Sequence, residues 1–158
     1  MANRTKKMVF SALFAALVCV ATMVIKIPSP LSGYINLGDS VVLLCGWMLG
    51  PWYGFLSAAI GSALADLFYG YMVYIPATFL IKGGVALIAC TLSQKTNRLV
   101  SAVAAEVVMV GAYYVFEGFL YGFGASLVNI LPNVIQGAAG ITVGLLLAKV
   151  FKKSGIQI

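Results

Sequence analysis

Residues 129–140, NILPNVIQGAAG, place three amide side chains in a segment that is otherwise apolar. At about 100° per residue along a helix, Asn129, Asn133 and Gln136 fall within about 60° of one another, so they share one face. Inside a bilayer each unpaired polar group costs several kcal/mol. Amide side chains often form hydrogen bonds between membrane helices, which would explain a single amide. Three aligned amides near the end of one helix, however, indicate the wall of a binding pocket.

The composition around this segment indicates a membrane protein. The 158 residues are 62% hydrophobic and 9% charged, with a mean hydropathy of +1.04, whereas soluble domains are nearer half apolar and a quarter charged. The net charge of +6 does not indicate nucleic acid, because most basic residues flank apolar segments, as the positive-inside rule describes. We therefore expect one all-α transmembrane domain over residues 1–158, surrounded by the lipid bilayer.

The residue types available for catalysis and metal binding are few. The sequence has no histidine, and Cys19, Cys45 and Cys90 lie far apart within apolar stretches. An intramembrane hydrolase needs a nucleophile with a base, and no such pair is evident. The sequence therefore predicts no catalytic residues and no metal site.

Six apolar segments predict a bundle of six helices, over residues 8–25, 39–49, 52–68, 75–92, 99–121 and 126–151. The second and third segments are shorter than the roughly 20 residues that cross a bilayer, and they meet at Gly50-Pro51. They could therefore form either two short spans or a re-entrant hairpin. The first has no small-residue cleavage pattern after it and is expected to be retained. The basic residues predict cytoplasmic N- and C-termini, with residues 26–38, 69–74 and 122–125 facing outward.

The first outward loop, KIPSPLSGYINLG, is long and rigid for a simple connection. It carries Pro28, Pro30, Gly33 and Gly38, and ordered loops of this length are usually functional. We expect it to form a lid over an external pocket.

The fifth segment repeats the pattern of polar residues on one face. Tyr113, Glu117 and Tyr121 recur at intervals of four residues, and carboxylates within membrane spans are rare and usually functional. This spacing predicts that Glu117 binds a ligand between tyrosine rings. Glu106 lies on the same face nearer the cytoplasm, and packing and coupling roles are both open for it.

The fourth segment brings a lysine into the membrane. Thr78 and Lys82 are four residues apart, and Lys82 lies about 10 Å from the outer end at 1.5 Å per residue. An ammonium at that depth needs a partner, for which Asp66 and Glu117 are the candidates. We expect a structural ion pair between Asp66 and Lys82, which leaves Glu117 for the ligand.

The first segment carries a stripe of small residues that includes Ala12 and Ala16. Small residues allow close approach of helices, so this stripe packs inside the bundle or serves a partner protein.

These features together resemble the S component of an energy-coupling factor (ECF) transporter, a bacterial vitamin importer. The resemblance covers nearly the whole chain and is carried by the basic N-terminus with Ala12 and Ala16, and by the stretches YINLGDSVVLLCGWMLGPWYGFLSAAIGSALADLFYGY, YIPATFLIKGG and LPNVIQGAAG. It implies a six-helix protein of the bacterial cell membrane that is not an enzyme, has no cofactor and takes one vitamin as its substrate.

The resemblance also implies roles for particular residues. Ala12 and Ala16 match the motif that contacts a transmembrane coupling subunit, which works with two ATP-hydrolysing subunits. The first outward loop and the outer halves of the last three helices would enclose the vitamin, with the residues Asn36, Thr78, Lys82, Tyr113, Glu117, Tyr121, Asn129, Asn133 and Gln136.

Tyrosines, amides and one carboxylate suit a small, flat heterocycle with hydroxyl or amine groups. We expect a pyridoxine-like or hydroxymethylpyrimidine ligand first and riboflavin next; a heavily anionic ligand such as folate would need more basic residues than Lys82. The alternative is a stand-alone proton- or ion-coupled transporter in which Asp66, Lys82 and Glu117 form a relay.

Overall fold

The computed structural model describes residues 2–31 and 34–154, and within these ranges six apolar helices form one bundle. Ser32 and Gly33, in the first outward loop, and the last four residues lie outside the described residues. The long helices are α1 (Ala2–Val24), α2 (Gly38–Leu49), α3 (Pro51–Tyr69), α4 (Ile75–Ser93), α5 (Arg98–Tyr121) and α7 (Ile130–Lys153). The short elements are the strands β1 (Ile27–Pro28) and β2 (Tyr34–Ile35), the helix α6 (Phe123–Ser126) and the 3-10 turn η1 (Leu127–Asn129).

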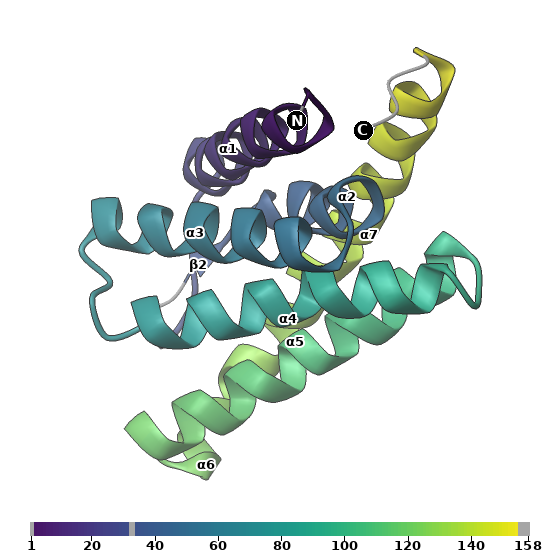
Figure 1. Ribbon diagram of the computed structural model, residues 1–158. Helices are drawn as coiled ribbons and strands as arrows, with labels where there is room; N and C mark the ends of the chain where they lie inside the picture. Colours follow the sequence, from purple (N-terminus) through teal and green to yellow (C-terminus); the bar gives the residue numbers. More distant parts are fainter. Residues whose placement is uncertain (1, 32–33, 155–158) are drawn as a thin grey trace.

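The helices form two layers (Figure 1). One layer consists of α1, α3, α4 and α5, each packed against the next, and the other consists of α2 and α7. The turn between α4 and α5 lies at the same end as the last turn of α7, and α6 lies at the opposite end with the loop between α3 and α4. The expectation of an all-α membrane bundle is confirmed.

Helix α2 is the centre of the bundle although it is the shortest of the six. It contacts α1, α3, α4 and α7, and ten of its 12 residues are buried. Close packing requires glycine here: a Cβ at Gly46 would lie 2.2 Å from the carbonyl oxygen of Ala86 on α4. The apolar residues at almost every position of this segment are therefore explained by neighbours on all sides.

The break between α2 and α3 depends on two residues. Gly50 has a φ of 83°, in the left-handed region that glycine adopts without a steric penalty. Pro51 then begins α3, where its missing N–H is not needed by the helix.

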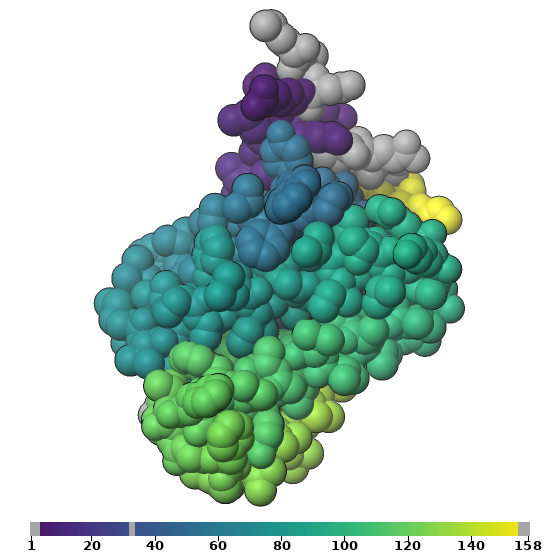
Figure 2. All heavy atoms as spheres, turned by 60° about the horizontal axis from the view of Figure 1, so that its bottom comes forward, coloured from purple at the N-terminus to yellow at the C-terminus, as the bar shows by residue number. Residues whose placement is uncertain are grey.

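Within the part of the chain that the structure describes, four segments are long and apolar enough to cross a membrane: Arg4–Val24, Ile75–Ser93, Arg98–Tyr121 and Phe123–Lys153. Helix α2 has 12 residues and so rises about 18 Å, less than the roughly 30 Å of the hydrocarbon core. Figure 2 shows α4 and α5 forming a continuous surface, from which the light-green end of α5 and α6 projects.

The outward ends differ from the expected helix pattern in two places. The last segment, expected as one helix from residue 126, contains η1 before α7 begins at Ile130. Pro132 lies in the first turn of α7, where it cannot donate a bond back to the preceding turn. The first loop contains a two-stranded antiparallel hairpin, with Ile27 opposite Ile35.

Candidate functional site

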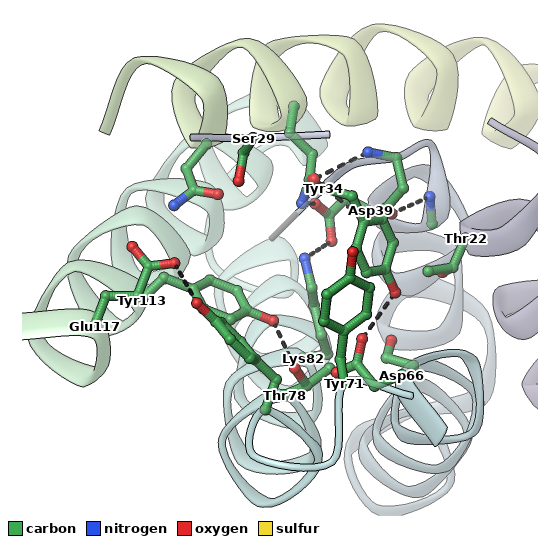
Figure 3. A pocket seen from close by; sticks show the side chains of 16 residues that line it. Thr22, Ser29, Tyr34, Asp39, Asp66, Tyr71, Thr78, Lys82, Tyr113 and Glu117 are labelled. Carbon is green, nitrogen blue, oxygen red and sulfur yellow. Dashed lines mark hydrogen bonds and ion pairs between the residues drawn. The ribbon is translucent and has the colours of Figure 1, made fainter. Parts of the chain in front are cut away.

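A polar cavity lies between the hairpin and the outward halves of the helices (Figure 3). Seven residues expected at a binding site line it: Asn36, Thr78, Lys82, Tyr113, Glu117, Asn133 and Gln136. Nine further lining residues come from α1, the first loop, β2, α2, α3 and the loop before α4: Thr22, Ser29, Tyr34, Gly38, Asp39, Ser62, Asp66, Tyr71 and Tyr74. We refer to this set of 16 residues as the polar cavity.

Lys82 forms its ion pair with Asp39, so the expected pairing with Asp66 is wrong. The Lys82 Nζ atom lies 2.5 Å from Asp39 Oδ1, and the two side chains are 5% and 0% exposed. Asp39 lies in the first turn of α2, where the helix dipole also favours a negative charge. Because α2 runs through the centre of the bundle, its N-terminus brings Asp39 to Lys82.

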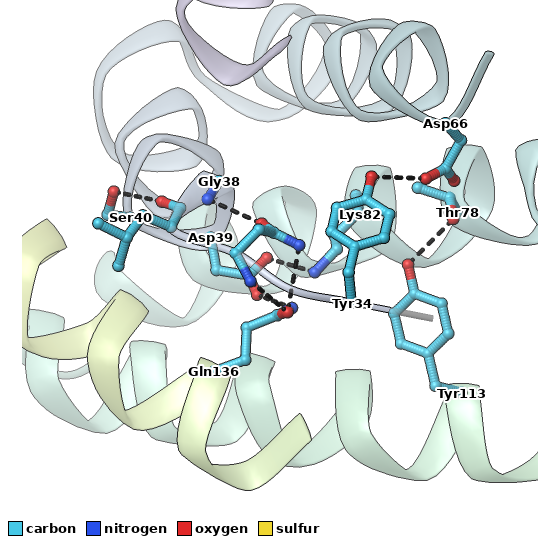
Figure 4. A network of polar contacts seen from close by, with 11 residues as sticks. Tyr34, Gly38, Asp39, Ser40, Asp66, Thr78, Lys82, Tyr113 and Gln136 are labelled. Atoms are coloured by element: carbon cyan, nitrogen blue, oxygen red, sulfur yellow. Dashed lines mark hydrogen bonds and ion pairs between the residues drawn. The ribbon is translucent and has the colours of Figure 1, made fainter. Parts of the chain in front are cut away.

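The polar residues of α7 and the first loop form one hydrogen-bonded network with this ion pair (Figure 4). The Gln136 Nε2 atom donates to Asp39 Oδ2 at 2.6 Å. Gln136 Oε1 accepts from the backbone N–H and the Nδ2 atom of Asn36, at 3.0 and 3.1 Å. A Cβ at Gly140 would lie 2.7 Å from Cβ of Asp39, so glycine there allows α7 to approach closely enough for these bonds.

Glu117 lies at the other side of the polar cavity in Figure 3. Its Oε1 atom accepts from Asn129 Nδ2 at 2.9 Å and from the Tyr74 hydroxyl at 3.3 Å. Asn129 Oδ1 also accepts from the backbone N–H of Leu31, and Asn129 Nδ2 donates to the Leu31 carbonyl oxygen, each at 3.4 Å. Asn129 thus connects Glu117 to the first loop without lining the cavity.

Tyr121 does not lie in the cavity. It is the last residue of α5, one turn beyond Glu117, and its side chain is 41% exposed. The spacing of four residues places Tyr121 on the same face of α5 as Glu117. Its position along the helix, however, lies past the end of the cavity.

The hairpin is held to α3 by a tyrosine. The Tyr34 hydroxyl donates to Asp66 Oδ1 at 2.8 Å. Burial, reinforced by the negative charge of Asp66, raises the pKa of Tyr34 far above its ordinary value, so that this hydroxyl remains a donor across the physiological pH range. Outside the cavity, Lys26 Nζ lies 5.5, 4.0 and 4.9 Å from the ring centroids of Tyr34, Tyr69 and Tyr71. These cation–π contacts fix the hairpin to the loop before α4.

The cavity is narrow with the side chains in their observed conformations. Its free volume is about 40 Å³, enough for one or a few water molecules. A larger guest therefore requires lining side chains to move.

Glu106 lies outside the polar cavity, at the base of a groove between α5 and α7. The groove measures about 370 Å³ and is otherwise lined by Val103, Val107, Val110, Val134, Gly137, Ala138 and Ile141; we call it the apolar groove. The side chain of Glu106 is 4% exposed, and neither carboxyl oxygen has a hydrogen-bond partner among the described residues.

Ala12 and Ala16 are exposed on the surface of α1. The packing of this helix uses the neighbouring face instead: Gly61 on α3 approaches the carbonyl oxygen of Ala15 so closely that a Cβ would lie 2.3 Å from it. Ala12 and Ala16 therefore do not pack inside the bundle, and the contact of this stripe with a partner protein stays a prediction.

The polar lining residues that sequence reasoning missed lie mainly on α2 and α3 and in the first loop. Asp39 carried a usable signal, because it is a carboxylate at the start of an almost entirely apolar segment. Ser62 and Thr22 carried none, since small hydroxyl residues are common on packing faces of membrane helices. Among the described residues, no group of three or more His, Cys, Asp or Glu could hold a metal ion.

Comparison with known proteins gives consistent matches. A family model described as the S component of an ECF-type riboflavin transporter matches residues 2–153. An uncharacterized protein of Pyrococcus woesei is 35% identical over 141 residues, which cover 86% of this chain and 95% of the relative. The thiamine precursor transporter HmpT of Lactococcus lactis subsp. cremoris is 26% identical over 154 residues, 96% of this chain and 90% of that protein.

Solved structures agree in fold. The S component of a bacterial ECF transporter superposes with a TM-score of 0.75 at 21% identity, covering 95% of this chain and 97% of the other. The S component for biotin from an ECF-type ABC transporter gives a TM-score of 0.66 at 17% identity, covering 96% and 93%.

Proposed function

This chain belongs to the family of S components of ECF-type riboflavin transporters, and we propose that its polar cavity binds one small heterocyclic vitamin or vitamin precursor from outside the cell. As a member of this family it is a multi-pass membrane protein and a substrate-binding subunit for vitamin uptake, not an enzyme. The observation that carries the proposal is the polar cavity itself. Hydroxyl, amide and carboxyl groups from nine regions of the chain line one void.

The walls of the polar cavity support a ring-shaped ligand. Tyr34, Tyr71, Tyr74 and Tyr113 all line it, and aromatic faces favour stacking on a flat heterocycle while polar groups fix its orientation. The hairpin, which bonds to Asp66 and is followed by Asn36 bonded to α7, would close over the ligand as a lid.

The lead ligand is pyridoxine-like or a hydroxymethylpyrimidine, with riboflavin next. Related proteins are described for riboflavin, for a thiamine precursor and for biotin, so the family name does not decide the ligand. A single small ring needs less opening of the cavity, whose free volume is about 40 Å³, than the larger tricyclic ring of riboflavin.

The exposed Ala12 and Ala16 support a docking role for α1. Small exposed side chains on a membrane helix allow a second helix to approach closely. We assign this face to a transmembrane coupling subunit that works with two ATP-hydrolysing subunits. The alternative of a proton or ion relay through Asp66, Lys82 and Glu117 loses support, because Lys82 is paired with Asp39.

A thermal-shift experiment tests the proposal. Purified protein in mild detergent is heated with each compound of a panel of water-soluble vitamins and precursors, and stoichiometry is read by native mass spectrometry. We expect stabilisation by one compound or a few related ones, bound 1:1. If no compound of the panel stabilises the protein or appears in the spectrum, the proposed function is wrong.

A further inference from the structure

Three buried oxygen atoms in the polar cavity have no hydrogen-bond partner within the described structure. They are Oε2 of Glu117, Oδ2 of Asp66 and Oγ of Ser62, whose side chains are 2%, 4% and 2% exposed. Buried polar atoms in native proteins are almost always paired, and an exception calls for an explanation such as an absent ligand or water. All three residues line the polar cavity, so these oxygens lie in its wall, where opening of the cavity would bring them to a bound molecule.

The unpaired oxygens form two groups. Ser62 and Asp66 are four residues apart on α3 and therefore lie on one face of that helix. Glu117 lies across the cavity, at the opposite side from Asp66 in Figure 3. When ionised, these carboxyl groups accept hydrogen bonds and do not donate them, so the complementary guest carries donors at both ends.

The charge of the cavity excludes an anionic guest. Among the described lining residues, Lys82 is the one cation, and Asp39 already neutralises it at 2.5 Å. Lys26 lies over the tyrosine rings and is not part of the lining. An anionic group on the ligand would therefore face Asp66 and Glu117 without a free positive charge to balance it.

We propose that the ligand is an uncharged or cationic planar ring with an amino group at one end and a second donor at the other. The amino group, with two hydrogens, bonds to Asp66 Oδ2 and Ser62 Oγ. The second donor, a hydroxyl or amine, bonds to Glu117 Oε2, and Tyr34, Tyr71, Tyr74 and Tyr113 enclose the ring. This assignment rests on the proposed function and narrows it: an aminated hydroxymethylpyrimidine binds better than pyridoxine, riboflavin or any phosphate ester.

Calorimetric titration of the full chain in mild detergent tests the proposal with four probes. They are hydroxymethylpyrimidine with its ring amino group, the same compound without the amino group, its phosphate ester, and pyridoxine. Hydrogen bonds to charged groups are the stronger ones, so we expect loss of the amino group to weaken binding by about tenfold to hundredfold. The phosphate ester is expected to bind more weakly than the aminated pyrimidine, by at least the same factor.

Ser62→Ala is the decisive variant because Ser62 Oγ bonds to no other described group. A purely structural role predicts unchanged binding of every probe. Our proposal predicts about threefold to tenfold weaker binding of the aminated pyrimidine and unchanged binding of the analogue without the amino group. Ser11→Ala is the matched control. Ser11 Oγ is also buried without a partner among the described residues, and it lies on α1 outside the polar cavity. This variant should bind all probes as the unaltered protein does.

The outcomes separate this proposal from the proposed function. Equal affinity for the aminated and deaminated pyrimidines, tight binding of the phosphate ester, or an unaffected Ser62→Ala would overturn it. If the pyrimidines fail but another compound of the thermal-shift panel binds 1:1, the chain remains a vitamin-binding subunit and the donor assignment is wrong. If no vitamin binds at all, both proposals fail together.

Discussion

Replacing Asp39 by asparagine should destabilise the protein more than any other single change among its carboxylates. The substitution keeps the shape of the side chain and leaves Lys82 buried without its counter-ion. Both side chains are almost fully buried, at 0% and 5% exposure. Removing one partner of a buried ion pair costs about 3–5 kcal/mol, because the other charge is left uncompensated.

That free energy is large enough to measure by thermal unfolding in mild detergent. For soluble domains of this size, 1 kcal/mol shifts the unfolding midpoint by about 2–4 °C. On that scale the expected decrease for Asp39→Asn is about 6–20 °C. Size-exclusion chromatography before heating verifies that the variant is folded at the starting temperature.

A second substitution separates loss of the counter-ion from other effects. Lys82→Met removes the charge and keeps a long apolar side chain, and replacing a whole buried ion pair by neutral groups is often tolerated. The double variant Asp39→Asn/Lys82→Met should therefore recover most of the lost stability. Asp66→Asn is the control: it weakens the bond from Tyr34, and Lys82→Met should not restore it.

The reasoning is refuted by the reverse pattern. If Lys82→Met rescues Asp66→Asn and not Asp39→Asn, Lys82 is paired with Asp66, as the sequence suggested. The N-terminus of α2 would then not bring Asp39 to Lys82. A decrease below about 2 °C for Asp39→Asn would also contradict it, since a buried ammonium without a partner is not tolerated at so small a cost.

Three further predictions concern the face of α1, the hairpin and the apolar groove. Ala12→Leu should abolish vitamin uptake by cells and leave ligand affinity of the purified protein intact; loss of affinity instead would contradict the docking role. Lys26→Met removes three cation–π contacts, each worth about 0.5–1 kcal/mol at exposed sites, so stopped-flow measurements should show faster ligand release, with Lys26→Arg retaining the slow rate. Equal release from both variants would argue against the hairpin as a lid. Glu106→Leu should raise the unfolding midpoint, because a buried carboxyl group without a hydrogen-bond partner among the described residues costs about 1–3 kcal/mol; a lower midpoint would show that the charge of Glu106 stabilises the bundle.

Much of the polar cavity could be predicted because helical periodicity selects a face. Asn133 and Gln136 on α7 and Tyr113 and Glu117 on α5 were placed on inward faces by spacing alone, and all four line the cavity. Tyr121 shows the limit of the method. It has the correct face, but its depth along the bundle depends on where α5 ends relative to its neighbours, and periodicity carries no information on that.

The sequence by itself determined that this chain forms apolar helices with polar groups concentrated at one end, because hydropathy and helical spacing are local properties that lipid enforces. Only the tertiary structure decided which groups meet. Lys82 contacts Asp39, 43 residues away, and not Asp66, because close approaches at Gly46 and Gly140 bring α2 into the centre of the bundle. The relative depth and rotation of packed helices follow from contacts between distant segments, and those contacts exist only once the bundle has assembled.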